Sequence, residues 1–597
     1  MIRLAVKVTM VPSAATTPKT SKKSKAKWHL PDPVSEAELR SLGTGSATAR
    51  VLWNRGIRSQ EAAREFLSPT LDMLHDPMRM HGMSRAVERL VRAIKEREKI
   101  LIYGDYDVDG TSSIVILKKA IELAGGEATY HVPHRLREGY GMRPEVLSDA
   151  VSRGITLVIS VDTGIRAAEL VRVATTLGLD MIITDHHLPD EDVPPAVAVL
   201  NPNQPGCEYP EKNLCGAGVT FKLIQALLKR LDWSESKAKR LLESFLKIVA
   251  IATVADVVPL TGENRVIVKT GLEGLGDVKN IGLRALLDVA GFTEGKAPSA
   301  GQVAFRIAPR INAAGRMANA SDVIELFLTG DAERAKDLAT QLHELNAERQ
   351  QTEAEIVQAI LNECNEFPVG DEQFALVFSR PGWHRGVIGI VASRIVERYN
   401  RPVFILGEEN GVAQGSGRSI RAFHLLEALE TMPHLFHKFG GHRQAAGLTM
   451  DAALVEEFRE KMNAHAAATL TRDHLRPVLD LDATIRIDEL DDETVAEIFG
   501  LAPFGFGNPA PVFLLEDCEI AGPPDVVKDK HLRIRFKQGG RFLKAMAFDF
   551  AERIDEVQPG ARIDLAVTIE EDDYSAARGY SWWATRIKDV RAAGTAS

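Results

Sequence analysis

The chain has 597 residues, of which 45% are apolar and 26% are charged, and these fractions exclude collagen, coiled coil and wholesale disorder. No run of about 18 apolar residues occurs, so no segment is expected to span a bilayer. The formal charge of −9 argues against a strongly basic protein that coats nucleic acid. The length predicts roughly two to four folding units.

Cysteine usage and the start of the chain bear on its location. Four cysteines without a CxxC pair make neither a disulfide framework nor a zinc site, which favours the reducing cytoplasm. Residues 1–30 are rich in lysine but lack the basic start, apolar stretch and cleavage site of a signal peptide. We expect a disordered basic leader, with an electrostatic tether for DNA as the alternative.

The first domain, residues 31–330, is predicted to be α/β with a helical N-terminal part. Short apolar runs alternate with helical spacing in its middle, which is typical of a parallel sheet with helices on both faces. Strands are expected at residues 99–104, 157–161 and 181–184, and helices at residues 112–124 and 165–177. Helical segments dominate from residue 216 to 328.

Two further domains are predicted after a long connecting helix. Residues 331–366 lack Pro and Gly and predict a helix about 54 Å long, the connector of residues 331–367. A second α/β domain (368–470) has strands at 374–378 and 402–406 and a helix at 387–398. The last domain (471–597) has strands at 532–537, 541–548, 562–569 and 580–590 and one helix near 491–499, a pattern that favours a small OB-like β-barrel.

Acids and histidines follow each predicted strand of the first domain. They are Asp105, Asp107 and Asp109 after the first strand, Asp162 after the second, and Asp185, His186 and His187 after the third. The carboxyl ends of parallel strands form one crevice, so these groups should converge. Carboxylates packed together repel unless cations neutralise them. A carboxylate-rich set with few imidazoles suits Mn²⁺ or Mg²⁺ better than softer ions.

Each run also has a purely structural interpretation. The DxDxDG pattern occurs in calcium loops, but position 12 of such a loop would be Ile116 instead of Glu. Asp162 could be a helix cap, and the adjacent His186 and His187 could be one core and one exposed histidine. Asp256 in ADVV could simply end a helix. Coincidence of the first three features, at successive strand ends, is the weaker explanation.

The motifs resemble those of the DHH phosphoesterase superfamily and, within it, the bacterial RecJ exonucleases. The resemblance runs from about residue 30 to the C-terminus and rests on GDYDVDG (104–110), VDTG (161–164), TDHH (184–187), LCGAGVTFKL (214–223), ATVADVVPL (252–260), PRINAAGRM (309–317), GWHRGVIGIVASR (382–394), SGRS (416–419) and GGHRQAAG (440–447). It implies a DHH domain, a DHH-associated second domain and an OB-like barrel.

The resemblance implies a hydrolase: a metal-dependent 5′-to-3′ exonuclease of single-stranded DNA. It would release mononucleotides or very short products in DNA repair and recombination. Two divalent cations, Mn²⁺ or Mg²⁺, would be held by Asp107, Asp109, Asp162, His186 and Asp256, with Asp105 as a further ligand or a neighbouring carboxylate. Asp162 would bridge the ions, and His187 would contact the scissile phosphate or its nucleophilic water, which makes Asp105, Asp162 and His187 the catalytic set.

Further residues are expected to hold the substrate. The resemblance assigns Ser416 and Arg418, in a Gly-rich loop, to a pocket for the 5′-terminal phosphate, with Arg316 and Arg135 as further members. His384, Arg385, His442, Gly440 and Gly441 lie in similar Gly-rich runs whose glycines could instead serve tight turns. The resemblance also suggests a single-strand DNA-binding protein and a RecQ-type helicase as partners of a monomer.

The barrel carries a basic hairpin at residues 528–544. Its candidate DNA contacts are Lys530 and the three residues Arg533, Arg535 and Lys537, which share one face because they alternate along a strand. Phe536 and Phe542 could stack bases or fill the barrel core. Two other functions stay open: hydrolysis of small phosphate compounds, which the additional barrel argues against, and a non-catalytic DNA-binding scaffold, which the complete acidic set argues against.

Overall fold

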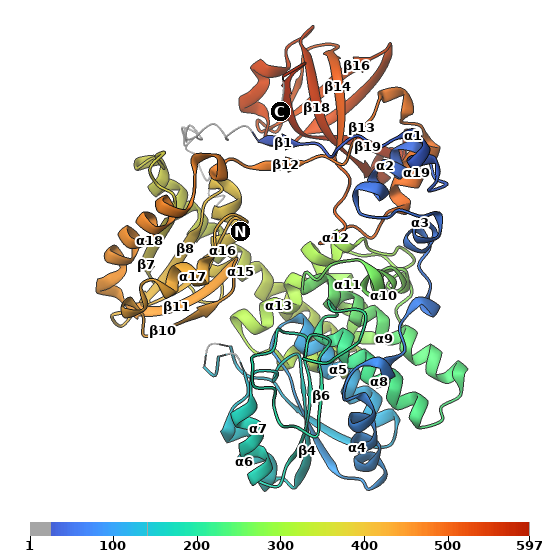
Figure 1. Ribbon diagram of the computed structural model, residues 1–597, viewed down its shortest axis with the longest axis vertical. Helices are drawn as coiled ribbons and strands as arrows, with labels where there is room; N and C mark the ends of the chain where they lie inside the picture. The colour runs from blue at the N-terminus through green and yellow to red at the C-terminus, as the bar shows by residue number, and fades with distance from the viewer. Residues whose placement is uncertain (1–25, 136, 140, 596–597) are drawn as a thin grey trace, which may run out of the picture. The chain divides into compact units, whose positions relative to one another are not determined.

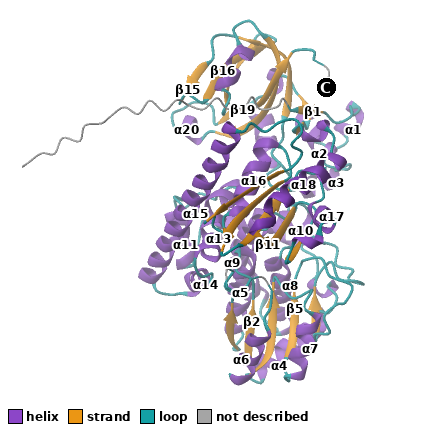
Figure 2. Cartoon of the chain, turned by 90° about the vertical axis from the view of Figure 1, so that its left-hand side faces the viewer, coloured by secondary structure: helices purple, strands orange, loops and turns teal. Residues whose placement is uncertain are grey.

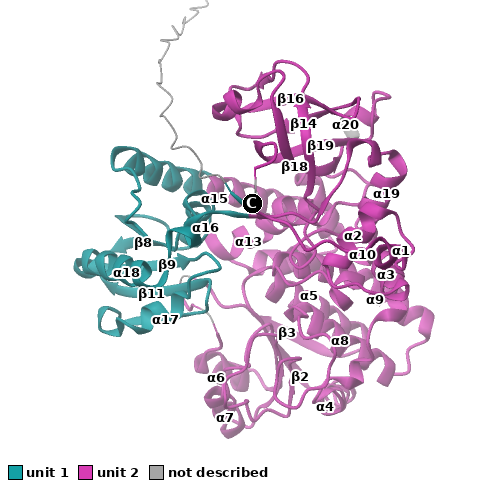
Figure 3. Cartoon of the chain, turned by 45° about the horizontal axis from the view of Figure 1, so that its top comes forward, with its two compact units in different colours: residues 1–27, 351–478 teal, residues 28–350, 479–597 magenta. Residues whose placement is uncertain are grey.

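The structure is a computed structural model in which residues 26–135, 137–139 and 141–595 are described. Most of the predicted leader lies outside these residues. The chain divides into two compact units (Figure 3): residues 28–350 with 479–597, and residues 351–478 with the first 27. In the described part of the chain, no helix is both long enough and apolar enough to cross a membrane.

A five-stranded parallel sheet organises the first domain. Its strands, in spatial order, are β3 (Glu127–His131), β2 (Lys99–Tyr103), β4 (Ile155–Val161), β5 (Asp180–Thr184) and β6 (Ala198–Leu200). The three predicted strands are confirmed, whereas the short β3 and β6 were not predicted. Because β3 and β4 lie on opposite sides of β2, the chain changes direction there, and such a switch point opens a crevice at the carboxyl ends of the strands.

Helices cover both faces of this sheet, as predicted (Figure 2). One face packs on α4 (Met83–Lys95), α5 (Val108–Leu123) and α8 (Gly216–Arg230), and the other on α6 (Pro144–Ser152) and α7 (Ala168–Thr176). Alternate residues of β2 divide between the two cores: Ile100 and Ile102 enter the first, Leu101 and Tyr103 the second. This period of two is what a strand buried on both faces requires.

A helical region follows and ends in the connector. It comprises α9 (Glu235–Ala255), α10 (Gly262–Gly274), α11 (Ile281–Val289), α12 (Ala300–Gln302), a π-helical turn (Val303–Ile307), α13 (Ala308–Met317) and α14 (Ser321–Leu328). The predicted connector is confirmed as the unbroken α15 (Ala332–Glu366).

The smaller unit contains a five-stranded sheet with the order β10–β11–β9–β8–β7. Its elements are β7 (Leu376–Pro381), α16 (Ile388–Tyr399), β8 (Val403–Glu409), β9 (Val412–Arg418), α17 (Leu425–Glu430), β10 (Lys438–Gly441), β11 (Ala445–Asp451) and α18 (Val455–Thr469). The expectation that Ser416 and Arg418 lie in a loop is wrong, because both belong to β9. Glycines concealed this strand and the β10–β11 hairpin, since glycine is depleted in strands.

The C-terminal domain is the predicted β-barrel. Its strands are β13 (Ala483–Thr484), β14 (Phe513–Ile520), β15 (Asp525–Val527), β16 (His531–Gln538), β17 (Arg541–Ala547), β18 (Arg562–Glu571) and β19 (Trp583–Ala592). The order β14–β18–β19–β17–β16 closes on itself because β14 also pairs with β16. The prediction of one helix is wrong: a second, short helix, α20 (Asp573–Ala576), accompanies α19 (Asp492–Gly500).

The N-terminal helices α1 (Glu36–Arg40), α2 (Ser46–Asn54) and α3 (Gln60–Leu67) belong with the barrel. Leu39, Leu52 and Ala63 share one buried core with residues of β14, β16 and β18, and α2 contacts α19 (Figure 1). The expectation that these helices form part of the first domain is therefore wrong. Residues 26–30 are also ordered, since β1 (Lys27–His29) forms and Trp28 donates a hydrogen bond to Asp589 of β19 (2.8 Å).

Candidate metal centre and phosphate-binding residues

The first acidic run begins helix α5. Asp107 is the N-cap, and its Oδ1 accepts the N–H groups of Asp109 (2.9 Å) and Gly110 (3.0 Å). Only glycine fits at residue 110, because a Cβ there would lie 2.5 Å from the carbonyl oxygen of Asp105. This close approach folds the run back so that Asp105 and Asp109 both become buried.

Asp162 follows β4 in a conformation that few residues adopt. Its φ is 58°, in the left-handed region where a non-glycine residue is uncommon. The first turn of α8 lies against it, since a Cβ on Gly216 would be 2.6 Å from the Cβ of Asp162. Such strain persists only where the surroundings enforce it, and it clusters at functional sites.

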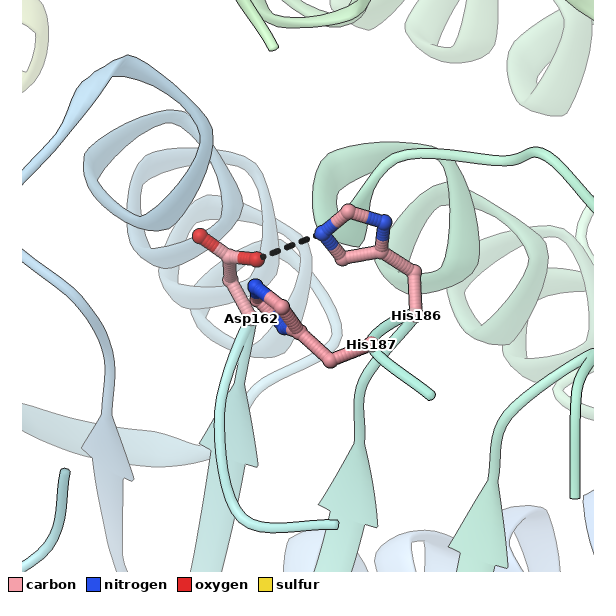
Figure 4. Close-up of side chains that lie close together, drawn as sticks. All are labelled: Asp162, His186 and His187. Atoms are coloured by element: carbon pink, nitrogen blue, oxygen red, sulfur yellow. Dashed lines mark ion pairs between the residues drawn. The ribbon is translucent and has the colours of Figure 1, made fainter. Parts of the chain in front are cut away.

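The TDHH run brings both histidines to Asp162 (Figure 4). Nε2 of His186 lies 3.2 Å from Oδ1 of Asp162. Oδ1 of Asp185 accepts the N–H of His186 (2.7 Å) and lies 2.7 Å from Nδ1 of His187, while Oδ2 accepts the N–H of Ile165 (2.9 Å). Asp185 therefore orients His187, a function that sequence reasoning missed although a carboxylate beside a histidine is a usual signal for it.

Asp109 and Asp256 complete the cluster from two helices. The carboxylate of Asp109 accepts the N–H groups of Gly216 (2.6 Å) and Ala217 (2.7 Å) at the start of α8. Asp256 is the C-cap of α9, so it does end a helix, and its Oδ2 lies 3.6 Å from Nε2 of His186. The same nitrogen is 3.8 Å from Oδ2 of Asp109.

The donor set fits hard divalent cations. Among the described residues, buried atoms without a hydrogen-bond partner include Asp105 Oδ1, Asp162 Oδ1, His186 Nε2 and Asp256 Oδ2. Buried polar atoms are normally paired, so four unsatisfied atoms in one cluster indicate a missing ligand. Oxygen donors with one imidazole are what Mn²⁺ and Mg²⁺ accept.

Burial and mutual repulsion act on these groups in the metal-free chain. Burial and the charge of Asp107 raise the pKa of Asp105 to about 8, and burial and Asp109 raise the pKa of Asp256 to about 9. Burial also raises the pKa of Asp162 and lowers that of His186. For His187, burial disfavours the charged ring, but the hydrogen bond and charge of Asp185 outweigh it and raise the pKa.

Two of the predicted arginines lie beside this cluster. The guanidinium of Arg135 lies 5.0 Å from the centre of the Tyr106 ring, and its charge favours ionised Asp105. Burial raises the pKa of Tyr106 to about 12, although the positive charges of Arg135 and Arg316 act to lower it. The structure therefore groups both arginines around the first acidic run.

In the smaller unit, Arg418 is positioned by its own strand. Its guanidinium donates to Oγ of Ser416 (3.0 Å) and to the carbonyl of Gly417 (2.7 Å). The first turn of α16 lies against this pair, because a Cβ on Gly389 would be 3.0 Å from Oγ of Ser416 and 3.2 Å from Nη2 of Arg418.

The other Gly-rich residues of this unit are distributed differently. The turn after Gly440 and Gly441, which includes His442, adjoins the end of β9, since Ser419 N–H donates to the carbonyl of Gln444 (3.1 Å). His384 precedes α16 and its Nδ1 accepts the N–H of Gly386 (3.2 Å). Arg385 instead pairs with Glu409 (2.8 Å), at the end of β8 away from Arg418.

The barrel hairpin presents its basic residues outward. Arg533 and Arg535 are exposed on β16, whereas Leu532, Ile534 and Phe536 fill the core. Phe542 on β17 is exposed, and the Arg535 guanidinium lies 4.7 Å from its ring centre. Of the two phenylalanines, Phe536 is therefore a core residue and Phe542 a surface residue. Lys530 is exposed, and Lys537 pairs with Glu519 (2.9 Å).

Carboxylates and histidines cluster at the carboxyl ends of a parallel sheet, and the family comparisons identify this arrangement as that of a DHH-type phosphoesterase. In agreement, the DHH family N-terminal domain matches residues 99–253, the DHHA1 domain residues 371–468 and the RecJ OB domain residues 481–581.

Known proteins refine this class. The single-stranded-DNA-specific exonuclease RecJ of Bacillus subtilis (strain 168) is 37% identical over 548 residues, which cover 91% of this chain and 68% of the relative. The protein of the same name from Dickeya dadantii (strain 3937) is 34% identical, with 92% and 96% covered. The crystal structure of RecJ with Mn²⁺ from Thermus thermophilus matches with a TM-score of 0.80 and 31% identity, over 96% of this chain and 81% of that one. The chain belongs to the RecJ family.

Proposed function

We propose that this chain is a metal-dependent exonuclease that hydrolyses single-stranded DNA from the 5′ end and releases mononucleotides or very short products. The observation that carries the proposal is the buried cluster in which four ligand atoms have no hydrogen-bond partner. The relatives named above are single-stranded-DNA-specific exonucleases, and one was crystallised with Mn²⁺. On the family resemblance, we propose that this activity serves DNA repair and recombination.

Six residues are the proposed ligands of two divalent cations, Mn²⁺ or Mg²⁺: Asp105, Asp107, Asp109, Asp162, His186 and Asp256. Asp162 belongs to two groups whose ligand atoms lie within 4.8 Å of one another, one with His186 and His187 and one with Asp105 and Asp107, which favours it as the shared ligand. When bound, such a pair of ions supplies Lewis-acid polarisation of the phosphate and of water. Burial lowers the pKa of His186 and so favours the neutral imidazole, which is the form that binds a metal.

His187 is proposed to contact the scissile phosphate or the attacking water. Asp185 engages Nδ1 of His187, so the ring presents Nε2 to the substrate. The hydrogen bond and charge of Asp185 raise the pKa of His187, which favours the protonated ring, and the protonated ring donates a hydrogen bond from Nε2 to a phosphate oxygen. Asp105 and Asp162 complete the catalytic set.

The 5′-terminal phosphate is proposed to bind at Ser416 and Arg418. A planar guanidinium matches two phosphate oxygens, and the first turn of α16 beside it adds the positive end of a helix. His384, His442, Gly440 and Gly441, in the same unit, are proposed further contacts, and Arg135 and Arg316, beside the metal centre, are proposed contacts of substrate phosphate. Arg385, which pairs with Glu409, is the member of the predicted set with the least support.

The strand itself is proposed to follow the outer face of β16 and β17. Arg533 and Arg535 are exposed there beside Phe542, and alternating cations and aromatic rings suit phosphates and stacked bases. Lys530 and Lys537 would extend this face. On the family resemblance, a single-strand DNA-binding protein and a RecQ-type helicase are proposed partners. The chain is proposed to be a cytoplasmic monomer, and its four cysteines are all free thiols.

Digestion of end-labelled single strands in Mn²⁺ or Mg²⁺ tests the function. A 5′ label should appear in mononucleotides or very short products from the earliest times, while a 3′-labelled strand shortens progressively. The matched control is Asp162→Asn. Early release of the 3′ label, internal cleavage or full activity of the control would contradict the proposal.

A further inference from the structure

Asp256 is held differently from three neighbouring acids of the cluster. The carboxylates of Asp107, Asp109 and Asp185 all accept backbone N–H groups, whereas the buried Oδ2 of Asp256 accepts no hydrogen bond in the described structure. The position of this carboxylate therefore depends on the backbone around it. On one side is the end of α9, where the Asp256 N–H donates to the carbonyl of Ala252 (2.9 Å).

The backbone on the other side is strained. Val257 has a φ of 59°, and a β-branched residue in the left-handed region is a rare and costly conformation. Such a residue keeps this conformation only when neighbouring groups hold the chain in place. The support must act on residues 257–260, between Asp256 and α10.

A loop of the barrel domain supplies that support. We call residues 501–509, between α19 and β14, the bracing loop. The Leu260 N–H donates to the carbonyl of Phe506 (2.8 Å). A Cβ on Gly507, whose φ is 73°, would lie 2.8 Å from Cβ and 3.0 Å from Cα of Pro259, and a Cβ on Gly505 would lie 2.7 Å from Cδ1 of Leu260.

The bracing loop is itself fixed on two sides. Buried Asn508 donates to the carbonyls of Leu501 (2.9 Å) and Pro503 (2.8 Å). Arg55, after α2, donates to Oδ1 of Asn508 and to the carbonyl of Pro509 (2.6 Å). From α10, buried Arg265 donates to the carbonyls of Ala502 (2.8 Å) and Phe66 (2.6 Å). These contacts tie the loop to the N-terminal helices and to α10.

We propose that the bracing loop positions Asp256, so that the barrel domain, besides any contact with DNA, is required for the metal centre to hold its divalent cations at full affinity. Gly507 is the positioning residue, since it alone allows Pro259 to approach. The inference rests on the proposed function of the metal centre.

The direct test is the affinity of the full-length chain for Mn²⁺ without DNA. Electron paramagnetic resonance measures it through the signal of the free ion. Gly507→Ala should weaken binding by about 10-fold, as changes behind a metal ligand commonly do. In digestion assays, excess Mn²⁺ should restore kcat while the KM for DNA stays unchanged. A variant that merely loosened the fold would show a lower Tm without this rescue.

The chain offers a matched control and a milder variant. Gly560 also lies in the barrel domain with a positive φ of 82°, but a Cβ there would meet nothing within 4 Å, so Gly560→Ala should bind Mn²⁺ like the wild type. In Gly505→Ala the new Cβ would meet only the Leu260 side chain, so the loss of Mn²⁺ affinity should be smaller. This variant tests the inference if Gly507→Ala does not fold.

Wild-type affinity in both Gly507→Ala and Gly505→Ala would overturn the inference. The same loss in Gly560→Ala would also overturn it, because backbone strain alone would then suffice. A wild-type chain that binds no Mn²⁺ would instead refute the metal centre itself.

Discussion

Buried carboxylates occur in two regions of this molecule, and their partners differ. In the barrel, Asp589 accepts hydrogen bonds from Arg553 (2.6 Å) and Trp28 (2.8 Å), and Asp564 from Arg591 (3.1 Å). In the metal centre of the first domain, buried Asp162 and half-buried Asp256 both lie near Nε2 of His186, at 3.2 Å and 3.6 Å. The barrel acids are therefore satisfied by donors of the protein, whereas the buried Oδ1 of Asp162 and Oδ2 of Asp256 accept no hydrogen bond in the described structure.

Substitution of Asp162 should separate the two regions most clearly. Asp162→Asn should lower the single-turnover rate by about 1,000-fold, because the stabilisation that a bound metal supplies is worth several kcal/mol. The variant should fold at least as stably as the metal-free wild type, since one of several repelling buried acids is gone. Rapid-quench assays and thermal melts measure the two effects. A substantial fall in metal-free stability would show that Asp162 is a structural acid like those of the barrel.

Addition of Mn²⁺ should raise the thermal stability of the chain through the acids of the metal centre. At 100 times its dissociation constant, a ligand specific for the folded state adds about 2.7 kcal/mol to the free energy of unfolding. Wild-type chain should therefore melt at a higher temperature in Mn²⁺, and Asp162→Asn should respond much less. Equal shifts in both would place the bound ion elsewhere.

The barrel should respond in the opposite sense to neutralisation of an acid. Asp589→Asn should lower the free energy of unfolding by about 2 kcal/mol, since buried donors lose their ionised acceptor. Mn²⁺ affinity should stay that of the wild type. Denaturant titrations with and without Mn²⁺ give both values, and an unchanged stability would remove the distinction between the two regions.

The smallest expected effect concerns Arg418. Arg418→Lys should reduce the preference for a 5′-phosphorylated strand over a 5′-hydroxyl strand by about 10-fold, because an ammonium cannot bind two phosphate oxygens in a plane. The ratio of kcat/KM for the two substrates measures this preference. An unchanged ratio would assign the terminal phosphate to another site.

Local patterns predicted the elements that build the metal centre. The apolar runs before Asp105, Asp162 and Asp185 are long enough to be recognised as buried strands, and parallel strands place their ends together. β6 has only three residues, and β9 contains glycines that are typical of turns, so neither pattern indicated a strand.

Long-range packing could not be predicted in the same way. The apolar positions of α2 predict a buried face but not that β14 and β18 cover it, because periodicity carries no information about the partner. For the same reason the contact of the bracing loop with residues 257–260 appears only in the structure. Asp185 was visible in the sequence, but its hydrogen bonds to His187 were not.

The count of Mn²⁺ ions bound per chain at equilibrium tests the central claim most directly. The wild type should bind about two ions, as a two-metal site requires, and Asp162→Asn, which loses the proposed shared ligand, should bind fewer at the same free concentration. Absence of binding, or the same count in both chains, would contradict the assignment of these unpaired acids to a metal centre.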